Sequence, residues 1–163
     1  CNGISPITRC STCRGTTHWP SRWLTAHLGL EGEVVRLPTE WEWQWVAQVG
    51  AAGLRFPWGS DWLDFGGNSR ESGIGRTTAV GLLPAGRVKE KEVFDMAGNV
   101  WEWCLNQEGD PSRRENGESR VLRGGAWSGI PDDCRAAYRS VDFGFRVCRG
   151  SPVDSWDASV AGR

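Results

Sequence analysis

The six cysteines are the most reactive side chains in the sequence, and two of them stand close together near its start. Cys10 and Cys13 have the CxxC spacing of a zinc knuckle or a redox turn, but no second CxxC completes a four-thiolate site. Together with Cys1 and His18 they could form a site of three thiolates and one imidazole. We favour unligated thiols, because a single CxxC is a weak signal for a metal.

The other three cysteines, Cys104, Cys134 and Cys148, are scattered among strand-like segments. A free cysteine in such a segment behaves as a small buried hydrophobic residue. We therefore expect a packing role for these thiols. One disulfide among the three is the alternative, and the sequence leaves its pairing open.

The composition limits both the fold and the partners. A chain of 163 residues makes one domain, and its 11 tryptophans can build a core because each buried aromatic ring removes about 150 to 250 Å² from water. The 22 glycines and 8 prolines predict a loop-rich fold. A formal net charge of -1 argues against nucleic-acid binding. We expect no membrane span and no signal peptide, because no apolar stretch has the required length or flanks.

Two short helices are expected in the first third of the chain. The first lies within residues 20–29, where apolar residues follow Pro20 at helical spacing. The second follows Thr39, which can form a capping box with Glu42. Trp41 and Trp45 share one face of this helix and Trp43 another. We therefore expect it to offer aromatic surface to two neighbours before Gly50 and Gly53 end it.

Short strands are expected in the second half. Alternating apolar residues in 93–103 bracket a Gly-Asn turn, residues 121–127 read as a strand with a Gly-Gly bulge, and residues 143–149 read as another strand. Turns dominate residues 56–86, residues 89–92 form an exposed hairpin or loop, and residues 106–119 form a polar loop. The predicted organisation is an irregular lead-in at 1–19, one domain at 20–149 and a tail at 150–163.

Four segments carry motifs in a fixed order: RLPTEWEW at 36–43, FPWG at 56–59, DMAGNVWEW at 95–103, and RGGAW at 123–127 with GFR at 144–146. Together they resemble the sulfatase-modifying-factor, or formylglycine-generating-enzyme-like, family. The resemblance runs from about residue 21 to residue 149. It implies an α+β fold of the C-type-lectin-like class, loop-rich, with two short helices and short antiparallel strands.

The family's catalysts use a pair of cysteines just after the RGG motif to bind copper and activate oxygen, and they convert a substrate cysteine into formylglycine. Here Gly129 stands at the first of these positions and only Cys134 lies nearby. A single thiol cannot form the two-thiolate copper site. We keep, as the alternative function, a formylglycine-generating oxidoreductase acting on a sulfatase cysteine through Cys134 with Cys148 or Cys104. The family's sulfoxide synthases add a histidine cluster, which a chain with 2 histidines lacks.

The resemblance instead favours the non-catalytic branch, which includes the variable proteins of diversity-generating retroelements. In that branch the stretch between RGG and GFR is rewritten at adenines, and most residues of this stretch belong to the permitted set. The implied function is binding of a protein or other surface ligand through residues 127–143. The candidate contacts are Trp127, Ser128, Gly129, Ile130, Asp132, Asp133, Tyr138, Ser140, Val141, Asp142 and Phe143. A degenerate structural module of a larger polypeptide is a third possibility.

A structural calcium ion is the one cofactor that the resemblance implies. The positions that supply two side chains and two main-chain carbonyls to calcium in this family are matched by Asp95, Gly98, Val100 and Glu102. Hard oxygen donors in a tight glycine turn suit Ca²⁺. The alternative is that the two carboxylates bond backbone amides of the turn.

Arginine and tryptophan side chains allow a structural and a binding interpretation. We favour ion pairs with the glutamates at 40, 42 and 102, rather than ligand contacts, for Arg123, Arg135, Arg139 and Arg146. Trp101 and Trp103 are expected in the core. Trp127, at the edge of the variable stretch, is expected to contact ligand.

Overall fold

The computed structural model describes residues 25–27, 33–88, 91–107, 120–138 and 148–150. Its strands are β1 Val34–Arg36, β2 Glu102–Gln107, β3 Arg120–Arg123 and β4 Cys148–Gly150, and its main helix is α2 Glu40–Ala47. Short 3-10 turns lie between them: η1 Gly50–Ala52, η2 Arg70–Ser72, η3 Pro84–Gly86 and η4 Pro131–Cys134. Residues 25–27 are helical, within the first expected helix. The expected α+β fold, rich in loops, is confirmed.

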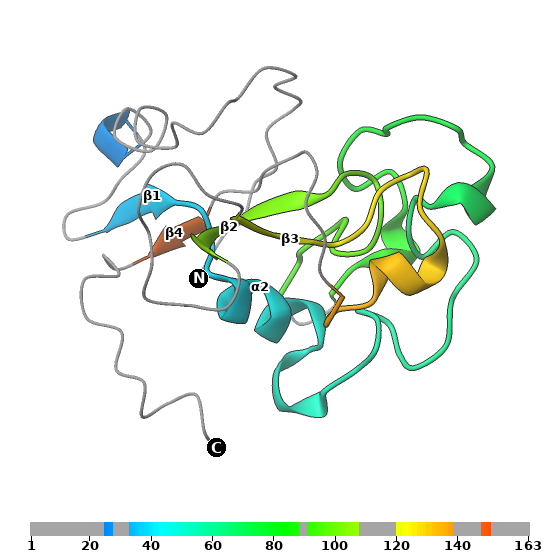
Figure 1. The fold of residues 1–163 in the computed structure, drawn as a ribbon, viewed down its shortest axis with the longest axis horizontal. Coiled ribbons are helices and arrows are strands. Elements are labelled where there is room, and N and C mark those ends of the chain that lie inside the picture. Colours follow the sequence, from blue (N-terminus) through cyan, green and yellow to red (C-terminus); the bar gives the residue numbers. More distant parts are fainter. Residues whose placement is uncertain (1–24, 28–32, 89–90, 108–119, 139–147, 151–163) are drawn as a thin grey trace.

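Two antiparallel pairs of strands form the frame of the fold. β1 pairs with β4 and β2 pairs with β3, with Val35 opposite Arg149 and Trp103 opposite Leu122. In Figure 1, α2 lies beside both pairs, and the loops between residues 50 and 100 occupy the other end of the molecule. The β1–β4 pairing therefore brings the last described residues back to the first strand.

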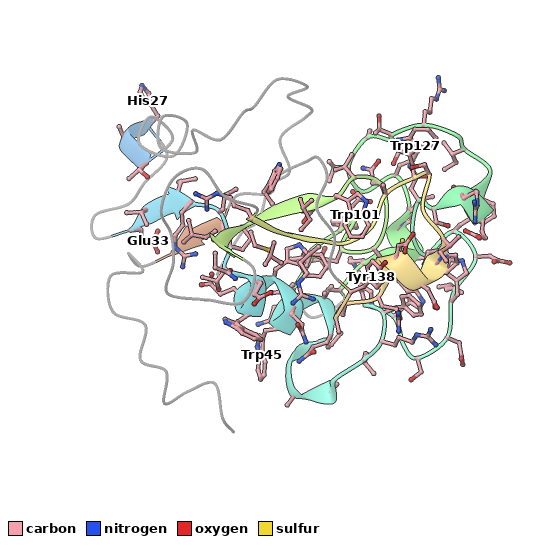
Figure 2. All side chains as sticks on the ribbon, in the orientation of Figure 1. His27, Glu33, Trp45, Trp101, Trp127 and Tyr138 are labelled. Carbon is pink, nitrogen blue, oxygen red and sulfur yellow. The ribbon has the colours of Figure 1, made fainter. Side chains whose placement is uncertain are left out.

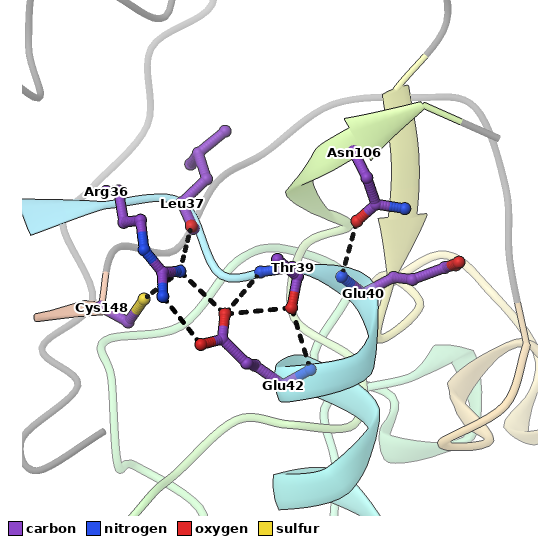
Figure 3. Close-up of polar contacts among 7 residues, drawn as sticks. All are labelled: Arg36, Leu37, Thr39, Glu40, Glu42, Asn106 and Cys148. Atoms are coloured by element: carbon purple, nitrogen blue, oxygen red, sulfur yellow. Dashed lines mark hydrogen bonds and ion pairs between the residues drawn. The ribbon is translucent and has the colours of Figure 1, made fainter. Parts of the chain in front are cut away.

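The start of α2 is fixed by a capping box, as the sequence predicted. The Thr39 hydroxyl accepts a 3.2 Å hydrogen bond from the Glu42 amide, and the Glu42 carboxylate accepts a 2.8 Å bond from the Thr39 amide. Both terminal nitrogens of Arg36 also donate to Glu42, each at 2.8 Å (Figure 3). These contacts tie the end of β1 to the first turn of α2.

The tryptophans of α2 do not have the arrangement that the sequence predicted. Trp43 is the buried one, with 1% of its surface exposed, whereas Trp41 is 37% exposed and Trp45 55% exposed. Trp43 turns toward β2 and β3, where a Cβ on Gly124 would lie 3.2 Å from its ring. Helix α2 therefore buries a single aromatic side chain against the sheet, and its other two tryptophans face outward.

Helix α2 ends at Ala47, before the glycines that were expected to end it. Val49, and not Gly50, is the first residue to take the left-handed conformation, with φ 60°. This region is unfavourable for a β-branched side chain, so the surrounding structure must hold it there. Gln48 contributes by donating a side-chain bond of 3.2 Å to the Gly50 carbonyl.

Two strand predictions are corrected by the structure. β3 stops at Arg123, and Gly124 and Gly125, with φ 97° and 78°, form the exit from the strand instead of a bulge inside it. β2 continues to Gln107, into residues expected to be loop, because β3 supplies its hydrogen-bonding partner. The expected turn at Gly98 and Asn99 is present, since both residues have positive φ.

Two small clusters form the core of the described residues. The larger contains Trp43, Ala47, Val88, Val93, Met96, Cys104, Val121 and Ala136, and the smaller contains Phe56, Ala97 and Cys134. Trp101 and Trp103, expected in the core, are only half-buried. No helix among the described residues is long and apolar enough to cross a membrane. The predicted lead-in at 1–19 and the tail beyond Gly150 lie outside the described residues.

Candidate functional site

The predicted binding stretch begins where the chain leaves β3 through two glycines. Gly125 has φ 78°, and a Cβ at this position would come within 2.6 Å of the Cys134 sulfur. Only glycine at position 125 therefore allows the backbone to lie this close to Cys134. The close contact places η4 against the end of β3, with the Cys134 side chain fully buried beneath the loop.

Three long-range hydrogen bonds fix the backbone of this stretch. The Trp127 amide donates to the Asn99 carbonyl at 3.1 Å, and the Gly129 carbonyl accepts from the Arg70 amide at 2.9 Å. The Ala136 amide donates to the Arg55 carbonyl at 2.9 Å. The stretch is thus anchored to three separate loops, while the side chains of Ser128, Ile130 and Asp132 remain exposed.

The side chains of the stretch are graded in exposure. Ser128, Ile130 and Asp132 are exposed, and Trp127, Gly129, Asp133 and Tyr138 are half-buried. In Figure 2, Trp127 and Tyr138 lie at separate places along this stretch. Four further predicted contacts, Ser140, Val141, Asp142 and Phe143, lie outside the described residues.

Asp133 has a local structural contact. Its carboxylate accepts a 3.1 Å hydrogen bond from the Ile130 amide at the start of η4. A Cβ on Gly129 would lie 3.0 Å from the same carboxylate. The position that carries a cysteine in the family's catalysts is therefore part of a tight turn here.

Tyr138 contacts one side chain that is distant in sequence, Trp101, and one that is close, Arg135. Its ring centroid lies 6.0 Å from that of Trp101, and the Arg135 guanidinium carbon lies 5.7 Å from the Tyr138 centroid. Figure 2 shows Trp101 and Tyr138 close together, with Trp127 farther from β1. Trp101, expected in the core, is thus a half-buried neighbour of the predicted binding residues.

Arg55 is a site residue that the sequence did not single out. Its Nη2 lies 2.5 Å from the Asp132 carboxylate, which also lies 3.9 Å from Arg135 Nε. Arg55 reaches this place because its carbonyl bonds Ala136, 81 positions later in the chain. Its place directly before the FPWG motif was the only available signal.

The expected structural role of the arginines holds for Arg123. Its guanidinium is fully buried and lies 3.2 Å from the Glu40 carboxylate, which is also buried. Arg123 Nη2 donates to Gln44 at 2.8 Å, and Nη1 donates to the Ala136 carbonyl at 3.1 Å. Arg135 pairs with Asp132 instead of a glutamate, and Arg139 and Arg146 lie outside the described residues.

The described cysteines are buried and free, so the possible disulfide among them is absent from these residues. Burial, together with the charges of Asp133 and Glu71, raises the pKa of the Cys134 thiol to about 12. Burial raises the pKa of Cys148 to about 11 and that of Cys104 still higher. Since the thiolate is the nucleophilic form of cysteine, these three thiols are poor nucleophiles at neutral pH.

The proposed calcium donors lie between Asp95 and Glu102, and three of their oxygens already accept hydrogen bonds from other groups of the protein. Asp95 Oδ2 accepts a 2.9 Å bond from the Gly81 amide, and Glu102 Oε2 accepts a 2.6 Å bond from the Trp43 indole. The Gly98 carbonyl accepts from the Val100 amide at 3.0 Å. The oxygen donors have the right chemistry for Ca²⁺, and an ion would have to share them with these N–H groups. The calcium site stays a prediction.

Fold and motifs together define the class of this protein. Residues 14–150 match the family described as the sulfatase-modifying factor enzyme 1-like domain. The chain therefore belongs to this family, and its fold is of the C-type-lectin-like kind.

Individual relatives differ in what they do. The chain is 37% identical over 134 residues to the serine/threonine-protein kinase pkn1 of Chlamydia pneumoniae, covering 70% of this chain and 21% of the kinase. It is 33% identical over 156 residues to the formylglycine-generating enzyme of Streptomyces coelicolor, covering 76% of this chain and 49% of the enzyme. Among solved structures, Treponema denticola variable protein 1 superposes with a TM-score of 0.60 and 29% identity, over 74% of this chain and 49% of that one. The chain thus spans between a fifth and a half of these proteins.

Proposed function

We propose that this domain is a non-catalytic binding module that recognises a protein or other surface ligand through residues 127–143, in the manner of a variable protein of a diversity-generating retroelement. One observation carries the proposal. The backbone between Trp127 and Ala136 is held by hydrogen bonds to three distant loops, while Ser128, Ile130 and Asp132 are exposed. Such an arrangement lets surface side chains change without changing the fold.

The chemistry of the thiols supports binding over catalysis. The family includes an enzyme, the formylglycine-generating enzyme, and a variable protein, so membership alone does not choose between the two. In this chain the first catalytic cysteine position is Gly129, and Cys134 is buried with a raised pKa. Neither position presents a thiolate to a substrate.

Tolerance of the surface to substitution tests the proposal directly. Replacing the three exposed side chains together, as Ser128→Arg, Ile130→Ser and Asp132→Asn, should lower the melting temperature by only a few degrees, because surface changes cost about 0.5 kcal/mol or less each. The matched control is Ala136→Ser, which places a hydroxyl in the core beside Arg123. A triple variant that unfolds as readily as the control would show that these side chains support the fold, and would overturn the proposal.

The genomic neighbourhood supplies a second test. A variable protein should be encoded beside a reverse-transcriptase gene and a template repeat that matches the codons of residues 120–146. If the neighbourhood lacks both, the retroelement assignment is wrong. Turnover of a sulfatase-type peptide that is lost in Cys134→Ser would instead establish the oxidoreductase function.

A further inference from the structure

Near Tyr138, two arginines approach one aspartate, and one of these arginines, Arg55, lies outside the predicted binding stretch. Arg55 and Arg135 both approach the carboxylate of Asp132, and their side chains are 47% and 39% exposed. Two cations share one anion, so this group of three residues carries a net charge of +1 near the aromatic pair Trp101 and Tyr138. We call Arg55, Asp132, Arg135 and Tyr138 the arginine patch.

Both guanidinium groups retain donors for a ligand. Arg55 uses Nη2 for Asp132, and Arg135 uses Nε for the Asp132 carbonyl at 2.9 Å. Within the described part of the chain, no hydrogen-bond acceptor faces the remaining terminal nitrogens of either side chain. A guanidinium edge matches the two oxygens of a carboxylate, and such bidentate bonds are among the stronger polar contacts.

The aromatic rings favour this edge-on recognition over the stacking of a sugar. The Arg135 guanidinium lies over the Tyr138 ring at 5.7 Å, and Trp101 lies on the same ring at 6.0 Å with an interplanar angle of 34°. Tyr138 is therefore engaged by protein groups and is half-buried. A sugar ring needs an open aromatic face, whereas a carboxylate needs only the outward edges of the two arginines.

We propose that the arginine patch binds an aspartate or glutamate side chain of a protein partner, so that the ligand of this domain is an acidic polypeptide segment. The proposal rests on the function proposed above and names the chemistry of its ligand. Charge complementarity selects the partner: a ligand carboxylate would share the two guanidinium groups with Asp132. Weakening the ion pair between Arg55 and Asp132 to admit the ligand carboxylate costs little, because exposed ion pairs contribute little to stability.

A peptide library tests the proposal with the whole chain. A phage library of random 12-residue peptides is selected on the wild-type chain, and the strongest peptides are resynthesised with each Asp and Glu replaced by the amide. We expect selected peptides to be enriched in Asp and Glu. Binding should weaken at least tenfold in the amide versions and in Arg135→Gln and Arg55→Gln, and it should weaken as salt screens the charges. The matched control Arg76→Gln, an exposed arginine of another loop, should bind as wild type does.

Asp132→Asn gives a test of opposite sign. Removing this competing carboxylate raises the local charge from +1 to +2, so acidic peptides should bind several-fold more tightly. Weaker binding would mean that Asp132 itself contacts the ligand. That result would overturn the proposal that the arginine patch binds a ligand carboxylate. Circular dichroism of each variant verifies the fold.

The remaining outcomes separate this inference from the proposed function. Selected peptides without acidic residues that are lost in Tyr138→Ala would overturn the acidic ligand and keep the surface. Peptides unaffected by every substitution in the patch, or no peptide at all, would overturn both. Binding of sialyllactose or a heparin fragment, lost in Arg135→Gln and without acidic peptides, would overturn the polypeptide ligand.

Discussion

The indole nitrogen of Trp43 in α2 donates a 2.6 Å hydrogen bond to the Glu102 carboxylate in β2, and both side chains are buried. Helix and sheet are thus joined by a polar contact inside the core. Because Glu102 is also a candidate calcium donor, this contact links the packing of α2 to the turn that precedes β2.

Removing the indole donor should destabilise the fold. In Trp43→Phe most of the ring contacts remain, but the Glu102 carboxylate loses a buried hydrogen bond. We expect a loss of about 1.5 to 3 kcal/mol in the free energy of unfolding, measured by urea denaturation. Trp45→Phe, at an exposed position of the same helix, should change stability by less than about 0.5 kcal/mol. Equal effects of the two variants would contradict the structural role of the bond.

Breaking the buried Arg123–Glu40 pair should destabilise the fold far more than breaking an exposed ion pair, even one with a shorter distance. Glu40→Ala leaves a buried guanidinium without this carboxylate, and we expect a cost of about 3 to 5 kcal/mol in urea denaturation. Glu92→Ala breaks a 2.7 Å pair with Arg87 that is largely exposed, and should cost less than about 1 kcal/mol. The reverse order would show that burial does not decide the cost of breaking these pairs.

Protonation of the Glu42 carboxylate in acid should lower the free energy of unfolding. Burial favours its neutral form, but hydrogen bonds from Arg36 and the Thr39 amide outweigh burial and hold the pKa of Glu42 below its ordinary value of 4.5. A depressed pKa stabilises the fold above the unfolded pKa, and this contribution is lost as pH falls through the lower folded pKa. The difference in unfolding free energy between wild type and Glu42→Gln should therefore shrink between pH 6 and pH 3. Ser128→Ala, which removes no ionisable group from an exposed position, should show a constant difference over this range.

The three described cysteines should resist modification in the folded protein. Burial and raised pKa values keep Cys104, Cys134 and Cys148 as neutral thiols at pH 8. A variant in which the cysteines at positions 1, 10 and 13 are serine isolates these thiols. Reaction with a chromogenic disulfide should be slow when the protein is folded and fast in denaturant. Rapid reaction of one thiol in the native state would favour the oxidoreductase alternative.

Calcium should raise the melting temperature if the predicted donors hold it, because an ion that binds only the folded chain stabilises it. Melting is compared in excess calcium and in chelator, for wild type and for Asp95→Ala. The calcium-dependent shift should disappear in the variant. Identical melting of the wild-type protein in both conditions would discard the site.

The sequence by itself determined the features that depend on local chemistry. The Thr39–Glu42 capping box, the positive-φ turn at Gly98 and Asn99 and the family motifs could all be recognised from residues a few positions apart. The absence of a cysteine at position 129 is likewise a property of the sequence, and it already argued against the two-thiolate copper site.

Only the tertiary structure decided the relationships between distant segments. Helical spacing places Trp41 and Trp45 on one face of α2 and Trp43 on another, but only packing against β2 and β3 decided that Trp43 is buried and the other two are exposed. Arg55 joins Asp132 because a backbone bond to Ala136 brings a loop 81 positions away to the binding surface. Periodicity describes neighbours along one element, whereas such contacts depend on how irregular loops close, and a loop-rich chain gives no period from which to predict that closure.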